Sequence, residues 1–143
     1  MFGQKESDRA TVAAGVGCRA DCDAEDVVRA ILAALELGAR DLADVRAIYA
    51  PEFKKDEPCL PLVADRLKKP LVFLPLTELE NQAAGALTSS EQVKSRFGVP
   101  SVAETAALAG AHALSRGKAP VRLVGPRTTF GGATCALAAE ERA

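Results

Sequence analysis

Apolar and polar positions along the chain form blocks that predict strands and helices in turn. The run Thr11–Cys18 is short and rich in small and β-branched residues, which is typical of a buried strand. Asp23 then precedes apolar residues at helical spacing, and Gly38 ends that pattern, so the spacing predicts a capped helix. In the first half of the chain we expect strands at 11–18, 45–50 and 71–74, and helices at 24–37 and 58–67.

The second half of the chain is mostly helical and ends in two further strands. Helical pieces are predicted between residues 77 and 116, separated by glycines and by Pro100. Ser101 and Glu104 fit a capping box at the start of the last piece, in which a hydroxyl and a carboxylate satisfy each other's backbone donors. Strands are expected at 121–124 and 134–138, with residues 125–132 as the loop between them.

The order of these elements predicts the fold class. Strands that alternate with helices indicate parallel βαβ units, whereas the last two strands, with no helix between them, should be antiparallel. We therefore predict an α/β fold, a three-layer α/β/α domain on a mixed, mostly parallel five-stranded sheet. A length of 143 residues suits one domain. We assign residues 1–10 to a flexible N-terminal segment and residues 11–143 to a single domain.

Composition and charge argue against several classes of protein. The 18 basic and 19 acidic side chains give a net charge of −1, which disfavours a nucleic-acid partner. No apolar run approaches the ~18 residues of a membrane span, and the N-terminus lacks a secretory signal, so we expect a cytoplasmic protein without membrane contact. The 4 cysteines and 1 histidine match neither a zinc nor a redox motif. We interpret the cysteines as reduced thiols and predict no metal and no cofactor.

The loop after the first strand is the first candidate binding element, because ligands of such sheets lie beyond the carboxyl ends of the strands. Gly15 and Gly17 allow close approach of the backbone, the following helix start favours anions, and Arg19 offers a fork suited to carboxylates. Ala20 stands where a dinucleotide-binding fingerprint needs a third glycine, so the sequence gives only weak support to a dinucleotide site. The alternative is a tight turn with a solvated Arg19.

Two further segments carry anion-binding residue types. Residues 52–57 place two lysines beside three carboxylates, and Lys54 is the candidate anchor if this loop faces a ligand. The helix starts at Ser90 and Ser101 offer hydroxyls and free amides. Solvation of the charged loop and simple helix capping explain the same residues without any ligand.

Nucleophilic catalysis finds little support in the sequence. The single histidine, His112, lies inside an alanine-rich helix, where a packing or surface role is the simpler interpretation. Cys18 lies at the end of the first strand, where a helix N-terminus is expected to lower a thiol pKa, so it is the one cysteine worth testing for reactivity.

Five blocks in the chain resemble a known family in their content and order. They are Gly15–Arg19, Glu52–Leu60, Ser90–Val93, Ser101–Leu108 and Thr134–Ala138. This pattern is similar to the CobE family, which also forms the C-terminal domain of CbiG-type proteins in cobalamin biosynthesis. The resemblance spans about residues 11–139 and is carried by the five blocks together. Arg127 stands where the family tends to have lysine, and Cys59 and Ser89 stand where glycine and proline are expected.

The resemblance implies a protein that handles a tetrapyrrole whose rim carries acetate and propionate groups. The expected ligand is a precorrin or cobalt-precorrin, and the expected role is that of an accessory protein, carrier or chaperone, with other cobalamin enzymes as further partners. We assign no catalytic residue. The candidate substrate-binding residues are Gly15, Gly17, Cys18, Arg19, Lys54, Glu57, Ser90, Ser101, Glu104 and Arg127.

Two other functions remain open at this point. The CbiG type opens a ring lactone and releases acetaldehyde, so the chain is either a binding protein or a hydrolase in which Glu57 or Glu104 activates water. Such a base needs a carboxyl pKa raised by burial. The second alternative is an interaction module that docks onto another cobalamin enzyme and binds no pigment.

Overall fold

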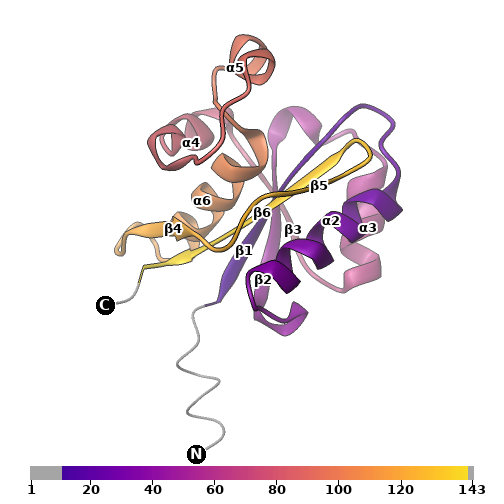
Figure 1. Ribbon diagram of the computed structural model, residues 1–143, viewed down its shortest axis with the longest axis horizontal. Helices are drawn as coiled ribbons and strands as arrows, with labels where there is room; N and C mark the ends of the chain where they lie inside the picture. The colour runs from indigo at the N-terminus through magenta and orange to yellow at the C-terminus, as the bar shows by residue number, and fades with distance from the viewer. Residues whose placement is uncertain (1–10, 142–143) are drawn as a thin grey trace, which may run out of the picture.

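The computed structural model describes residues 11–141, and its helices lie on both faces of one central sheet (Figure 1). The flexible segment expected at residues 1–10 lies outside this range. The strands are β1 (Val12–Cys18), β2 (Val45–Pro51), β3 (Leu71–Leu74), β4 (Val121–Leu123), β5 (Thr128–Phe130) and β6 (Ala133–Glu140). The α-helices are α2 (Ala24–Leu37), α3 (Cys59–Leu67), α4 (Leu76–Glu80), α5 (Glu91–Phe97) and α6 (Val102–Leu114), with short 3-10 turns at Leu42–Asp44, Glu52–Lys54 and Ala83–Gly85.

The sheet confirms the predicted α/β class but differs from it in strand count. Within the described residues it has six strands in the order β3-β2-β1-β6-β4, and β5 pairs with β6. β1, β2 and β3 pair in parallel, whereas β6 is antiparallel to β1, β4 and β5. Two of these five pairings are parallel and three are antiparallel, so the sheet is mixed but not mostly parallel as predicted. The strand missing from the prediction is β5, which lies in the segment expected as a loop. Three residues are too few for a periodic signal, and pairing with β6 across the turn at Gly131 and Gly132 makes them a strand.

The two faces of the sheet have separate cores. On β6, Cys135 and Leu137 belong to the core beneath α2 and α3, while Ala136 and Ala138 belong to the core beneath α6. This division follows from the two-residue period of a strand, which turns successive side chains to opposite faces. Both faces are therefore apolar, and the sheet is buried between two helical layers (Figure 1).

The helix α6 lies unusually close to the sheet. A Cβ atom on Gly15 of β1 would collide with the backbone of Ala103 and Ala107, and one on Gly110 would overlap the ring of Tyr49. Because these positions are glycine and 6 of the 13 residues of α6 are alanine, helix and sheet meet almost backbone to backbone. This packing brings the start of α6 next to the end of β1, where Gly17 lies beside Val102.

Candidate functional site

A cleft of about 640 Å³ opens beyond the carboxyl ends of β1 and β2. Its walls come from five parts of the chain: residues 17–20 at the end of β1, residues 53–54 after β2, α5, the start of α6, and the segment 127–134 that includes β5. Ligands of open α/β sheets bind at this edge of the sheet. The volume lies within the roughly 300–1,000 Å³ of small-molecule sites.

The charged side chains that line this cleft are all basic. Arg19, Lys54, Arg96 and Arg127 reach it from four different segments, and the described residues that line it include no aspartate or glutamate. Since the whole chain has a net charge of −1, this grouping is local. Basic groups around a concave surface produce a positive potential that attracts anions.

The arginine after β1 is positioned by the β5–β6 turn. The backbone N–H of Arg19 donates to the carbonyl of Gly132 at 3.0 Å. A Cβ on Gly132 would lie 3.3 to 3.4 Å from the Cδ, Cβ and Cγ atoms of Arg19, so the glycine leaves room for the arginine stem. The hairpin therefore fixes the backbone from which the guanidinium projects.

The N-terminus of α6 forms another wall of the cleft. Ser101 caps the helix, and its Oγ accepts a hydrogen bond from the N–H of Glu104 at 3.3 Å. Ser101, Val102 and Ala103 all line the cleft. Because the first turn of a helix carries unpaired N–H groups and the positive end of the helix dipole, it adds to the positive potential of the cationic side chains.

The structure brings together some of the sequence-predicted site residues and separates others from the cleft. Those that line the cleft are Gly17, Cys18, Arg19, Lys54, Ser101 and Arg127. Those that do not are Gly15, Glu57, Ser90 and Glu104. Gly15 is buried beneath α6, and Ser90 caps α5 by accepting from the N–H of Val93 at 3.3 Å.

The carboxylate of Glu104 has a structural partner. It is 2% exposed and accepts from the backbone N–H of Thr88 at 2.9 Å and from the Thr88 hydroxyl at 2.7 Å. Only the serine half of the predicted capping box forms, because the carboxylate turns to Thr88. Glu104 therefore ties the segment before α5 to α6.

The expected lowering of the Cys18 pKa by a helix N-terminus is wrong. Burial raises the pKa of Cys18 to about 12, and the neighbouring Cys59 thiol raises it further than Lys54 lowers it. The thiol therefore stays protonated at neutral pH, which makes it a poor nucleophile. Desolvation by the surrounding elements outweighs the favourable positive charge of the cleft.

A comparison with known protein families shows which family this chain belongs to. The family model described as "Cobalamin synthesis G C-terminus" matches residues 12–138. The chain belongs to this family. The match covers all strands of the sheet except the end of β6, so family membership applies to the whole described domain.

Solved structures agree with the cobalamin synthesis G C-terminus family. CobE, a protein from the cobalamin (vitamin B12) biosynthetic pathway, shares 34% identity with a TM-score of 0.84, over 93% of this chain and 94% of that one. The cobalamin biosynthesis protein chiG from Agrobacterium tumefaciens shares 32% identity with a TM-score of 0.68, over 92% and 100% of the two chains.

A more distant structure supports the fold alone. A putative cobalamin biosynthesis protein G homolog from Sulfolobus solfataricus shares 20% identity with a TM-score of 0.67, over 94% of this chain and 38% of that one. The search of curated proteins finds no significant match. Among residues 11–141, none of the helices combines the length and apolar character needed to cross a bilayer.

Several cleft residues of this family member were not predicted from the sequence, and three of them form one aromatic group. Phe53 and Phe97 stack with ring centroids 4.5 Å apart and planes 9° from parallel, and the Arg96 guanidinium lies 5.1 Å from the Phe97 ring centroid. All three line the cleft. The available signal was that both phenylalanines stand in polar stretches, where an aromatic side chain has no obvious core to join.

Proposed function

We propose that this member of the cobalamin synthesis G C-terminus family binds a carboxylate-rich precorrin or cobalt-precorrin in the cleft. In this role it acts as an accessory protein, carrier or chaperone for the intermediate. The observation that carries the proposal is the meeting of Arg19, Lys54, Arg96 and Arg127 around one cleft whose described lining residues include no carboxylate. Family membership supplies the pathway, and the cleft supplies the chemistry of recognition.

The charge of the cleft suits an anionic rim. Acetate and propionate groups project from a tetrapyrrole in several directions. The cationic side chains that line the cleft likewise come from four separate segments. Arginine forms two parallel hydrogen bonds to a carboxylate, while lysine acts as a more flexible point charge. The amides at the start of α6 accept a further carboxylate in the same manner as other helix N-termini.

The cleft also offers apolar surface to a macrocycle. Phe53, Val93, Phe97 and Val102 line it together with the basic side chains. A tetrapyrrole has a broad apolar plane inside its polar rim, so it needs both kinds of contact. Small-molecule sites commonly combine apolar walls with a few placed polar groups.

The lactone hydrolase alternative needs a general base within reach of substrate. Glu104 is committed to Thr88, and Glu57 accepts from the backbone N–H of Asp21 at 3.2 Å without lining the cleft. The geometry therefore favours binding over hydrolysis. Acetaldehyde release during incubation with a lactone-bearing cobalt-precorrin would reverse this preference.

A spectroscopic titration tests the proposal. Purified protein is added to a corrin whose acetate and propionate groups are free acids, and the visible bands are followed. We expect a saturable shift at one corrin per chain, and a much weaker response with the same corrin as its neutral methyl ester. Unshifted bands at high protein concentration, or equal affinity for acid and ester, would contradict the proposed recognition.

A further inference from the structure

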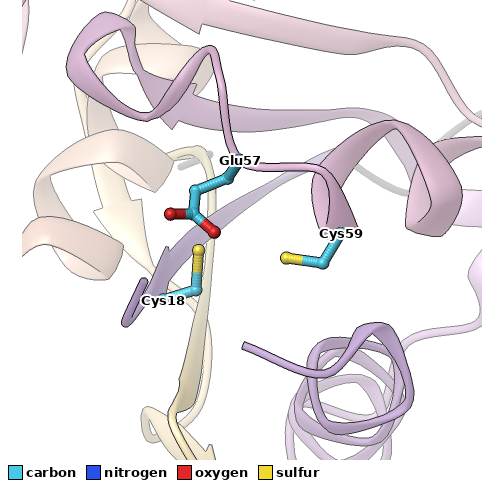
Figure 2. A group of neighbouring side chains, drawn as sticks. All are labelled: Cys18, Glu57 and Cys59. Atoms are coloured by element: carbon cyan, nitrogen blue, oxygen red, sulfur yellow. The ribbon is translucent and has the colours of Figure 1, made fainter. Parts of the chain in front are cut away.

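Three side chains with metal-binding donor atoms meet beside the cleft. The Sγ atoms of Cys18 and Cys59 and a carboxylate oxygen of Glu57 all lie within 4.8 Å of one another. Figure 2 shows the three side chains pointing toward a common centre. Cys18 ends β1, Cys59 is the first residue of α3, and Glu57 lies just before that helix, so the fold assembles the group from separate segments.

The spacing is close to that of a tetrahedral metal site. Zinc binds thiolate at about 2.3 Å and carboxylate at about 2.0–2.2 Å, which places neighbouring ligand atoms roughly 3.4 to 3.8 Å apart. Contraction by about 1 Å, within reach of side-chain rotation, brings donors at the observed separation to that geometry.

Cys22, in the loop that follows Cys18, lies outside this group of three. Its half-buried thiol donates to the backbone carbonyl of Asp23 at 3.7 Å. Two thiolates and one carboxylate leave the fourth position of a tetrahedral zinc ion to a water molecule, and this donor set favours borderline-soft cations over magnesium or calcium.

The carboxylate in this group is already oriented. One Glu57 oxygen accepts from the backbone N–H of Asp21 in the loop between Cys18 and Cys22. Hydrogen bonds of this kind hold metal ligands in position and tune their strength. The same contact ties the loop after Cys18 to the cluster.

We propose that Cys18, Cys59 and Glu57 form a binding site for a borderline-soft divalent cation such as Zn²⁺ in the wall of the cleft. Cys18 belongs to both the cluster and the cleft lining, so the cation lies directly beside the space assigned to the anionic ligand. The proposal stands on the geometry of the cluster and does not depend on the tetrapyrrole function.

Cobalt(II) is the optical probe for this site. Fully reduced protein is titrated with Co²⁺ alone, without any tetrapyrrole, and absorption is followed for thiolate-to-cobalt charge transfer and tetrahedral d–d bands. We expect both at one Co²⁺ per chain, with loss of the bands when Zn²⁺ is added. Absence of a charge-transfer band at millimolar Co²⁺ overturns the proposal.

Variants locate the cation. Cys59→Ser removes a central thiol, and Glu57→Gln removes the carboxylate charge while keeping an oxygen that accepts from Asp21. We expect each to weaken Zn²⁺ binding at least tenfold. The control Cys135→Ala alters a cysteine in the core outside the cluster and should bind Zn²⁺ as the wild type does. Circular dichroism verifies folding, and Glu57→Gln remains decisive if Cys59→Ser fails to fold. Wild-type affinity in folded Glu57→Gln overturns the assignment.

Discussion

The ring of Phe53 stacks on the ring of Phe97 at a centroid distance of 4.5 Å. Phe53 belongs to the turn after β2, and Phe97 is the last residue of α5. The contact therefore links the end of the sheet to a short helix without any buried residue of its own. Both rings line the cleft, so the stack also supports one of its walls.

Loss of this stack should be measurable as a coupling free energy. In a double-mutant cycle of Phe53→Ala and Phe97→Ala, we expect a coupling of about 0.5–1.5 kcal/mol in the free energy of unfolding, the range for aromatic pairs. The control cycle pairs Phe53→Ala with Leu37→Ala, because Leu37 is exposed at the far end of α2. Equal coupling in the two cycles would contradict a specific Phe53–Phe97 interaction.

The basic side chains should account for ligand affinity. We expect Arg19→Ala and Lys54→Ala each to weaken binding of a corrin free acid by about 1–3 kcal/mol, the scale of a lost charge-assisted hydrogen bond. Lys118→Ala is the matched control, since Lys118 is exposed in the turn before β4 and does not line the cleft. Titration followed by visible absorption measures the corrin affinity of all three variants. Unchanged affinity in both cleft variants would remove these residues from the site.

Two glycines of β1 should respond differently to the same substitution. Gly15→Ala places a methyl group against the backbone of α6, so we expect a loss of about 1–3 kcal/mol or more in the free energy of unfolding. Gly17→Ala should cost much less, because the nearest atoms to a new Cβ lie 3.6 to 3.7 Å away. Urea denaturation measures the free energy of unfolding of both variants. Similar losses would mean that α6 does not pack as closely as the structure shows.

The buried thiol of Cys135 should make the stability of the fold depend on pH at alkaline pH. Burial of Cys135 raises its pKa above the ordinary value of 9.0. Above pH 9 the folded state keeps a proton on Cys135 that the unfolded state releases. The contribution of the buried thiol to the free energy of unfolding is therefore complete below pH 9 and is lost as pH rises further. Above pH 9 we expect the wild type to lose about 1.4 kcal/mol more per pH unit than Cys135→Ala. Parallel curves from urea denaturation at pH 8 to 11 would contradict this assignment.

Local sequence patterns were enough to predict several helices and strands and one strand pairing. The strand at β1, the capped helix α2 and the antiparallel pairing of β4 with β6 are confirmed. β5 was missed because its three residues are a strand only through pairing with β6. The family resemblance, read from five blocks, is confirmed by the match over residues 12–138.

Site residues were harder to predict because their positions depend on tertiary contacts. Glu104 fits a local capping motif, yet its carboxylate binds Thr88, a partner that no local pattern reveals. Phe53 and Phe97 meet only after the sheet and helices have formed. Likewise, the grouping of Cys18 with Cys59 arises because the end of β1 and the start of α3 lie side by side, and the spacing of the cysteines along the chain does not indicate it.

A crystal structure of the protein with a bound corrin free acid tests the central claim most directly. We expect the macrocycle to occupy the cleft, with its carboxylates against Arg19, Lys54 and Arg127 and its plane against the stacked phenylalanines. A corrin bound on another surface, with these side chains free of ligand, would contradict the claim that the cleft recognises an acid-rimmed tetrapyrrole.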